Sequence, residues 1–330
     1  MPIPTIPPHR ATLTPPQDPL GHALHHLRLQ SALCCRSELT APWSIDMPIM
    51  PDTLMVHVVT QGSCWLQLQN QPPIQLHPGH VALVAHGKGH QISSAPNLHP
   101  TPLFSLPITR ISDRYELLQH GGPGPQTTAI CAVAHLGHPI AQKLTASLPP
   151  HICVNTTDPH TNPHFENTLA LLTHEAQALR PGGETIISRL TDILVIQILR
   201  AWIEDEGATH SQWLKALQDP QVGKALALIH QNPQTTWTVE TLARTVATSR
   251  SGFAARFRAV VGQPPMQYLT DWRMAVARDM LKTSTRSLLE VAEACGYASE
   301  AAFSRAFRRH VGTPPGAFRT QAGQHQTATH

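Results

Sequence analysis

FAARFRAVVGQPPMQY (residues 253–268) recurs as FSRAFRRHVGTPPGAF (residues 303–318), fifty positions later. In both copies the first aromatic residue is followed by another at +4, Gly at +9, Pro-Pro at +11 and +12, and a third aromatic residue at +15. Each copy follows an Ala-rich segment, at 242–247 and at 291–296. A repeated helix pair on a basic segment predicts two helix-turn-helix (HTH) units that present two recognition helices to one face of DNA.

Positive charge is concentrated around this repeat. Residues 221–320 carry 13 Lys or Arg against 6 Asp or Glu, a net charge of +7, whereas the whole chain of 330 residues has +3. Eleven of those 13 basic residues are Arg, which can bind phosphate or guanine through two parallel hydrogen bonds. This distribution favours a polyanionic partner and, together with the repeated helix pair, predicts double-stranded DNA.

The second copy carries the clearer helix signals. Ser287 and Glu290 have the spacing of a capping box, and Gly296 suits the turn that ends the helix. Ser299 then caps the recognition helix. Its predicted core face comprises Ala302, Phe303, Ala306 and Phe307. The opposite face is a candidate DNA surface that comprises Glu300, Ala301, Ser304, Arg305, Arg308 and Arg309.

The first copy follows the same plan. Thr238 caps a helix that runs to about Val246, and Ser249 caps the recognition helix. The predicted core face comprises Phe253, Phe257, Val260 and Val261, and the candidate DNA surface comprises Arg250, Ser251, Ala254, Ala255 and Arg258. Alanine cannot hydrogen-bond a base and at most contacts a thymine methyl group. We therefore expect this copy to bind more through phosphate contacts than through base readout.

A single helix is predicted between the copies, from Pro265 to about Leu281. Its apolar face comprises Met266, Leu269, Met274, Val276, Ala277, Met280 and Leu281. Arg273 and Arg278 lie on another face, and we expect both to face phosphate or solvent. A helix of about 16 residues is about 24 Å long and can hold two recognition helices roughly one DNA turn apart.

Residues 237–284 and 287–319 closely resemble the DNA-binding domain of AraC/XylS-type transcriptional regulators. The similarity includes the Gly296-Tyr297-x-Ser-x-x-x-Phe-x-Arg-x-Phe307 core and the Gly-x-x-Pro closure of each copy. The resemblance implies two HTH units joined by a linker helix, each with its recognition helix in the major groove. We assign Ser304 and Arg305 to base readout and Arg250 and Arg308 to phosphate contacts, with a solvated surface residue as the alternative for each.

The N-terminal half carries short apolar runs separated by turn residues. The runs lie at 54–59, 64–68, 74–76 and 81–85, a spacing that predicts a β-sandwich or barrel. Residues 40–95 are similar to the cupin-type effector domain of many AraC-type regulators, most clearly in the Pro-Gly turn at 78–79 and in His86-Gly-x-x-His90. A small barrel with an apolar mouth is suited to an unknown small-molecule effector.

A divalent metal is one candidate cofactor of this domain. His57, His86 and His90 could converge if their strands are neighbours, and three imidazoles suit Zn, Fe or Cu. Metal-binding cupins, however, carry His-x-His with a following Glu, where this chain has His57-Val-Val-Thr-Gln-Gly62. With 22 histidines in the chain, pocket-lining or structural histidines are the favoured interpretation, and no cofactor is expected.

Cysteine provides a rival sensor chemistry. Cys34, Cys35 and Cys64 fall in or near the predicted barrel, and an exposed thiol of low pKa can be oxidised reversibly. Free cysteine is also among the most buried residue types, as a small hydrophobic side chain, and this is the interpretation for Cys295 beside the second HTH turn.

Two helices are predicted between the barrel and the repeat. The first spans 164–180 and stops at Pro181-Gly182-Gly183, and the second spans 184–206. The second is apolar around most of its circumference, which indicates packing on more than one neighbour: on the barrel, or on the barrel and also a second subunit. We expect a homodimer.

These observations predict a multidomain α+β chain with a cupin-like β-barrel, a helical connector and an all-α double HTH. The expected boundaries are 1–16 (disordered), 17–130 (effector-sensing), 131–207 (connector or dimerisation), 208–320 (DNA-binding, after a connector at 208–220) and 321–330 (disordered).

The predicted function is that of a non-enzymatic, sequence-specific transcriptional regulator that responds to a small molecule or redox signal, with RNA polymerase as a candidate partner. A metal-dependent cupin enzyme with an autoregulatory HTH domain is the alternative. The N-terminus lacks an apolar signal segment and 186–203 is interrupted by charges, so we expect a cytoplasmic protein without a membrane partner.

Overall fold

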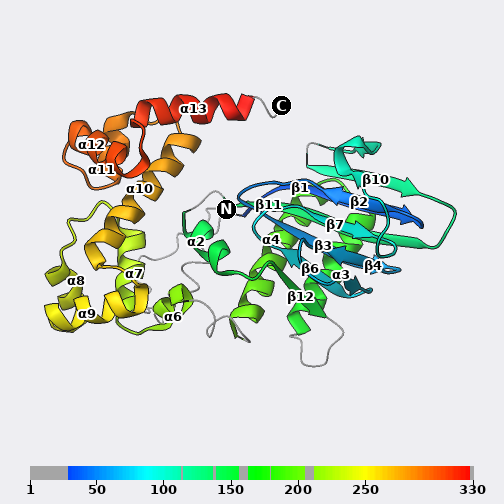
Figure 1. The fold of residues 1–330 in the computed structure, drawn as a ribbon, viewed down its shortest axis with the longest axis horizontal. Helices are drawn as coiled ribbons and strands as arrows, with labels where there is room; N and C mark the ends of the chain where they lie inside the picture. Colours follow the sequence, from blue (N-terminus) through cyan, green and yellow to red (C-terminus); the bar gives the residue numbers. More distant parts are fainter. Residues whose placement is uncertain are drawn as a thin grey trace, which may run out of the picture. The chain divides into compact units, whose positions relative to one another are not determined.

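The computed structural model describes residues 29–112, 114–136, 139–155, 163–178, 180–204 and 212–327. The chain divides into two compact units, one within Leu27–Ser211 and one that starts at Gln212. The first unit, here named the barrel unit, contains all the described strands (Figure 1). The second, here named the helical unit, contains only helices among its described elements. Residues 1–16, predicted to be disordered, lie outside the described residues.

The strands of the first unit form two sheets, of seven and five strands. The larger sheet has the order β12-β6-β3-β11-β1-β10-β9 and the smaller one the order β5-β4-β7-β2-β8. The larger comprises β1 (Leu29–Thr40), β3 (Thr53–Gln61), β6 (His80–Val84), β9 (Ile108–Arg110), β10 (Tyr115–Gly121), β11 (Gln126–Leu136) and β12 (His151–Asn155). The smaller comprises β2 (Ser44–Met47), β4 (Cys64–Gln67), β5 (Ile74–Leu76), β7 (His90–Ser93) and β8 (Thr101–Pro102).

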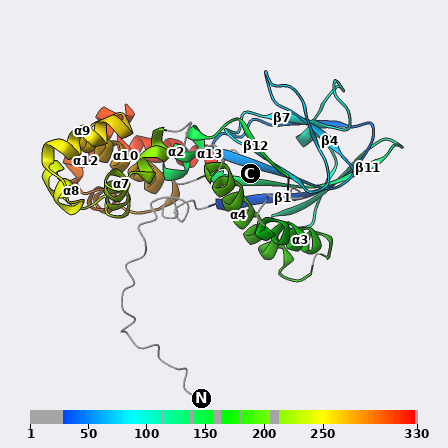
Figure 2. The ribbon, with the colours of Figure 1, turned by 90° about the horizontal axis from the view of Figure 1, so that it is seen from below.

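Apolar side chains between the two sheets form the core of this unit. Leu39, Ile45, Leu66 and Leu76 are fully buried in it. Seven consecutive residues of β3 are buried, as expected of a strand that is covered on both faces. Figure 2 shows the sheets as separate layers, with α3 (Pro163–Ala178) and α4 (Gly183–Trp202) on the outer side of the larger one.

The four strands predicted from apolar runs are confirmed as β3, β4, β5 and β6. The helical prediction for the following region was wrong at His151–Asn155, which forms β12 and pairs antiparallel with β6. Ladder hydrogen bonds along an exposed sheet edge decide the structure of these five residues. The helices of this unit are α2 (Pro139–Ser147), α3 and α4.

The break between helices α3 and α4 lies at the predicted Pro181-Gly182-Gly183 segment. Gly182 has φ = +82°, the left-handed conformation that glycine adopts without steric cost. Helix α4 buries Ile187, Leu194, Val195, Ile198, Leu199 and Trp202. Ile186 and Ile193, seven residues apart, stay 47% and 46% exposed, so a second apolar face of α4 is left open to solvent.

Among the described residues, no helix has an apolar stretch long enough to span a bilayer.

The helical unit contains the two predicted HTH units in sequence. Its helices are α6 (Gln212–Gln218), α7 (Val222–Gln231), α8 (Val239–Thr245), α9 (Arg250–Val261), α10 (Pro265–Thr283), α11 (Leu288–Ala294), α12 (Glu300–Val311) and α13 (Pro315–Thr327). Helices α8 and α9 form the first HTH unit, α11 and α12 form the second, and α10 is the linker. Each recognition helix ends at a left-handed glycine, Gly262 (φ +86°) or Gly312 (φ +89°), before the two prolines.

The predicted caps are confirmed. The side chains of Thr238, Ser249 and Ser299 accept hydrogen bonds from backbone N–H groups in the first turns of α8, α9 and α12. Ser287 and Glu290 form the predicted capping box of α11. Side-chain oxygens at these positions satisfy N–H groups that the helix itself leaves without a partner.

Three predicted details were wrong in the helical unit. Val260 and Val261 are half-buried rather than core residues, because the last turn of α9 lies at the edge of its unit. The predicted connector at 208–220 contains α6, whose Leu214 and Leu217 are buried. Helix α13 continues to Thr327, into a tail that was expected to be disordered.

Candidate nucleic-acid interface and effector sites

The two recognition helices bury the predicted core faces except at Val260, Val261 and Ala302, which were predicted to be core residues and are half-buried. On α9, Phe253 and Phe257 are buried, and on α12, Phe303, Ala306 and Phe307 are buried. The candidate DNA-contacting residues on both helices are exposed except for Ala254 and Ser304, which are half-buried. They are Arg250, Ser251, Ala254, Ala255, Arg258, Glu300, Ala301, Ser304, Arg305, Arg308 and Arg309.

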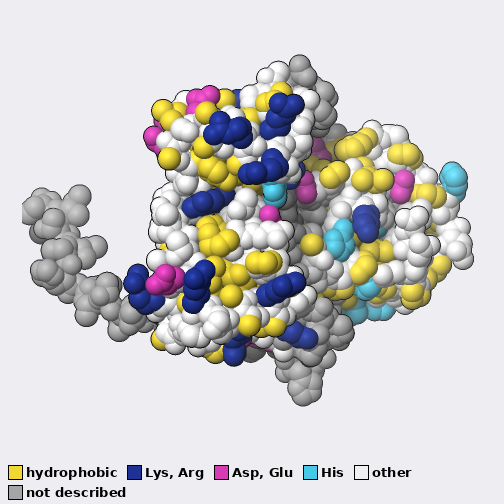
Figure 3. All heavy atoms as spheres, turned by 60° about the vertical axis from the view of Figure 1, so that its left-hand side comes forward, with side chains coloured by type: hydrophobic (Ala, Val, Ile, Leu, Met, Phe, Trp, Pro, Cys, Tyr) yellow, Lys and Arg dark blue, Asp and Glu magenta, His cyan; other side chains and the backbone are white. Residues whose placement is uncertain are grey.

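Basic side chains are exposed on the helical unit. Figure 3 shows Lys and Arg side chains spread over the face of this unit that the view presents. Arg256 of α9 is bound within the protein, because its Nε and Nη2 atoms both lie 2.8 Å from Oδ2 of Asp219. Oδ1 of Asp219 accepts hydrogen bonds from the backbone N–H groups of Gln221 and Val222. Asp219 therefore fixes the start of α7 and the side of α9 that faces it.

The prediction for Arg273 was wrong. We expected it to face phosphate or solvent, whereas its guanidinium is half-buried and donates hydrogen bonds to the carbonyl oxygens of Pro233 and Thr235. Desolvation by this burial lowers the pKa of Arg273. Helical periodicity gave the correct face of α10 but could not show that a loop from 40 residues upstream covers it. Arg278 is exposed, with Cζ 5.7 Å from the centroid of the Phe318 ring.

Inside the barrel unit, the side chains of two cysteines and two histidines lie side by side. Cys35 of β1 is opposite Cys131 of β11, and Cys131 is opposite His57 of β3. Nδ1 of His57 lies 3.1 Å from Sγ of Cys131, and Nε2 of His57 lies 2.7 Å from Nε2 of His90. The short distance between the imidazoles requires one Nε2 to donate and the other to accept, so the accepting imidazole is neutral at this atom. Burial lowers the pKa of His57 to about 4 and that of His90 well below 6.5.

The third histidine of the candidate metal site lies elsewhere. Nε2 of His86 is 3.0 Å from the carbonyl oxygen of Leu148. Two imidazole nitrogens 2.7 Å apart leave no room for an ion between them, since each Zn–N bond is about 2.0 Å long. Within the described ranges, no three His, Cys, Asp or Glu side chains are arranged to hold a metal ion.

The candidate redox thiols are buried to different degrees. Sγ of Cys34 lies 3.8 Å from the Thr191 hydroxyl, and Sγ of Cys35 lies 3.8 Å from the Ser37 hydroxyl. Burial raises the pKa of Cys34 and Cys35 to about 11 and that of Cys64 to about 12. Thiolate is the reactive form, so these pKa values favour a packing role for all three thiols near neutral pH. Cys131, which lies beside His57, was not identified from the sequence because strand register alone brings the two together.

The buried His57 predicts acid-sensitive stability of the barrel unit. Its pKa of about 4 lies below the value of about 6.5 in an unfolded chain, so the unfolded state binds more protons. The contribution of the neutral His57 to the free energy of unfolding is fully present above about pH 6.5, and about 3 kcal/mol of it is lost as pH falls to about 4. Urea unfolding should therefore show a steeper pH dependence for the wild type than for His57→Leu, which cannot titrate.

Equal slopes for the wild type and His57→Leu would contradict the assignment of a lowered pKa to the buried His57.

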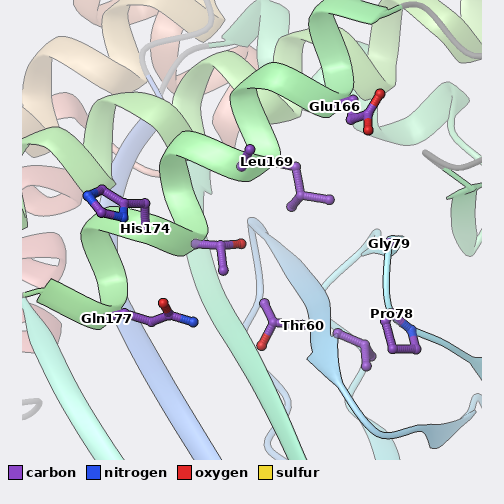
Figure 4. Close-up of a pocket in the computed structure, with 10 residues that line it drawn as sticks. Thr60, Pro78, Gly79, Glu166, Leu169, His174 and Gln177 are labelled. Carbon is purple, nitrogen blue, oxygen red and sulfur yellow. The ribbon is translucent and has the colours of Figure 1, made fainter.

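Two hollows of different kinds lie among the described residues of the barrel unit. One is an enclosed cavity of about 50 Å³ between the sheets, lined by Leu33, Cys35, Ser37, Ile45, Met47, Ile92, Leu103, Ile108, Glu116, Leu118, Cys131 and Val133. The other is an open groove of about 550 Å³ along α3, here named the α3 groove (Figure 4). The α3 groove is lined by Val59, Thr60, Pro78, Gly79, Glu166, Leu169, Ala170, Thr173, His174 and Gln177.

Both halves of the chain match known protein families. A family model described as cupin matches residues 18–204, and one described as helix-turn-helix domain matches residues 242–321. A putative AraC-like transcription regulator of Streptomyces lividans is 33% identical over 92% of this chain and 98% of its own length. The HTH-type transcriptional regulator AlkR of Acinetobacter baylyi is 30% identical over 85% of this chain and 92% of its own length.

One solved structure that resembles the C-terminal part is the DNA-binding domain of AdpA, a global transcriptional factor, in complex with a target DNA. It has 37% sequence identity and a TM-score of 0.30, and the match covers 31% of this chain and 92% of that chain.

Proposed function

The chain belongs to the AraC-type transcriptional regulators, and from this membership we propose that α9 and α12 enter successive major grooves of promoter DNA under the control of a small molecule bound by the barrel unit. The observation that carries the proposal is the pair of capped recognition helices. Each buries a phenylalanine face and exposes an arginine-bearing face, and α10 joins the two. A linker of 19 residues is about 28 Å long, which suits helices roughly one DNA turn apart.

The two recognition helices have unequal roles in this proposal. On α12, Ser304 and Arg305 can hydrogen-bond base edges. On α9, Ala254 and Ala255 occupy the corresponding face and can offer only a methyl contact to thymine. Helix α9 therefore contributes mainly phosphate contacts, through Arg250 and other exposed arginines.

The test is titration of the full chain against DNA upstream of its own gene, with random DNA as the control, at several salt concentrations. About four phosphate contacts predict that a fourfold rise in salt weakens binding roughly a hundredfold. We expect selective binding to the upstream DNA that persists when binding to random DNA is lost. Equal affinity for both DNAs at every salt concentration would contradict a sequence-specific regulator of that gene.

We infer that the effector occupies the α3 groove. The enclosed cavity holds only a few water molecules at about 10–15 Å³ each, whereas about 550 Å³ lies in the range of small-molecule sites. The close-up shows Thr60 and Gln177 on opposite sides of the groove, one on the sheet and one on α3 (Figure 4). A ligand in contact with both would favour one arrangement of α3 and of α4, which packs on α3.

The proposed effector site is tested in the same titration. A compound that shifts the DNA affinity of the wild type should have no effect on Ala170→Trp, because the new side chain fills the α3 groove. Leu171→Trp is the matched control, since Leu171 is exposed and lies outside the groove lining. Equal responses of the two variants would place the effector elsewhere.

We also propose that the open face of α4 forms a homodimer. Ile186 and Ile193 are the large exposed apolar residues on this face, 47% and 46% exposed. Two copies bound at paired sites would bind cooperatively, so Ile193→Asp should lose cooperativity while its affinity for a single site is retained. The relatives named above are regulators, which supports a binding role for the barrel rather than catalysis.

A further inference from the structure

Arg273 connects the linker helix to the first HTH unit. It lies in the middle of α10 and is half-buried. Its Nε donates a hydrogen bond of 2.8 Å to the carbonyl oxygen of Pro233, and its Nη2 donates one of 2.9 Å to that of Thr235. Both carbonyl groups belong to the loop that leads into α8. One guanidinium therefore holds the entry to the first HTH unit against the linker.

The same guanidinium contacts the second HTH unit. Cζ of Arg273 lies 5.8 Å from the centroid of the Tyr297 ring, within the range of a cation–π interaction. Tyr297 belongs to the turn between α11 and α12, and its ring lies edge-on to Phe303, 5.7 Å between centroids. Phe303 is fully buried in the face of α12 that supports the recognition surface. The contact thus continues from the linker through Tyr297 to α12.

A glycine permits the turn of the second HTH unit to approach this closely. Gly296 has φ = +73°, and a Cβ atom there would lie 2.6 Å from Nη2 of Arg273 and 2.8 Å from the carbonyl oxygen of Gln234. Gln234 is part of the loop that Arg273 holds. The turn of one HTH unit and the entry loop of the other therefore meet at the Arg273 side chain.

We propose that Arg273 is a positioning residue that fixes the orientation of one HTH unit relative to the other and does not itself contact DNA. This inference rests on the proposed function, in which α9 and α12 bind a single DNA site together. Two linked modules bind more tightly than either alone only if the geometry lets both engage at once. Helix α10 supplies the distance between the units, and Arg273 prevents each unit from rotating about its own end of the helix.

The experiment measures the affinity of the full-length chain for three DNAs. One contains the complete site found in the titration, one has the half bound by α12 scrambled, and one has two base pairs inserted between the halves. Arg273→Ala should bind the complete site about tenfold or more weakly, yet bind the half site within about twofold of the wild type. It should also tolerate the insertion better than the wild type does.

Two further variants separate positioning from charge. Arg278→Ala removes an exposed arginine from the same helix, and any loss should be equal on the complete and half sites. Arg273→Lys keeps a positive charge near Tyr297 but is a compact donor that cannot reproduce the two fixed hydrogen bonds of the guanidinium. We expect its affinity for the complete site to fall between those of Arg273→Ala and the wild type.

A second readout needs no DNA. In Arg273→Ala, amide hydrogen exchange should become faster in residues 232–237 and 296–299, whereas the buried turns of α9 and α12 should stay protected. The positioning role would be overturned if Arg273→Ala lost the same factor of affinity on the complete site and on the half site. It would also be overturned if the insertion weakened binding of Arg273→Ala as much as it weakens binding of the wild type. A wild type that binds the half site as tightly as the complete site would instead refute two-helix binding itself, before any substitution is considered.

Discussion

Phe307→Ala is expected to lower the free energy of unfolding of the helical unit by about 3–5 kcal/mol, because it leaves a cavity in a packed core. The Phe307 ring is fully buried, and its centroid lies 5.6 Å from those of Phe303 and Phe318. The same cluster contains Met274 and Leu281 of the linker helix. These contacts hold α12 on α10, so the variant should also lose the contribution of α12 to DNA binding.

Urea unfolding followed by the helical circular dichroism signal measures this effect. The matched control is Leu289→Ala, which also truncates a large apolar side chain in the second HTH unit. Leu289 is 47% exposed, so we expect a change of about 0.5 kcal/mol or less. Losses of similar size in the two variants would show that the ring cluster is not the core of this HTH unit.

The helical unit could be predicted in detail because its signals are local. Each cap requires one side chain and an amide two or three residues away, as for Ser299 and the N–H of Ala302. The aromatic pair four residues apart places both rings on one face of a helix whatever surrounds it. The repeat then shows the same arrangement twice, which makes chance agreement improbable.

Arg273 and β12 were beyond the reach of local patterns. Periodicity places Arg273 on a polar face of α10, but its partners, Pro233 and Tyr297, come from loops on either side of the linker in sequence. Strand β12 is short and has no strong alternation, and its pairing with β6 across 67 or more positions decides its structure. In both cases a long-range contact overrides a local preference.

The barrel site could be predicted only in part. His57, His86 and His90 were named as residues that could converge, and two of them, His57 and His90, lie 2.7 Å apart through Nε2. Whether a third ligand joins them depends on strand register, which the spacing of histidines does not specify. The register places Cys131 beside His57, whereas His86 lies in the turn after β6 (His80–Val84), with the Leu148 carbonyl as its partner.

Arg305→Ala is expected to weaken binding to the complete site by about 1–3 kcal/mol, roughly 5- to 150-fold in Kd, and to relax the preference at one base pair. Arg305 is exposed on α12 and directly follows Ser304. An arginine at such a position can donate two hydrogen bonds to O6 and N7 of guanine in the major groove. Arg256 of α9 cannot act in this way, because Asp219 holds its guanidinium.

Arg308→Ala is the matched control for this measurement. Arg308 is also exposed on α12, one turn further on, where we assign it to the phosphate backbone. Its loss should weaken binding to the complete site and to random DNA equally, and should reduce the salt dependence of log K by about 1. Arg305→Ala should instead change the ratio of the two affinities. Equal losses on both DNAs for Arg305→Ala would assign it to the backbone as well, and base readout by α12 would then depend on Ser304 and on the shape of the DNA.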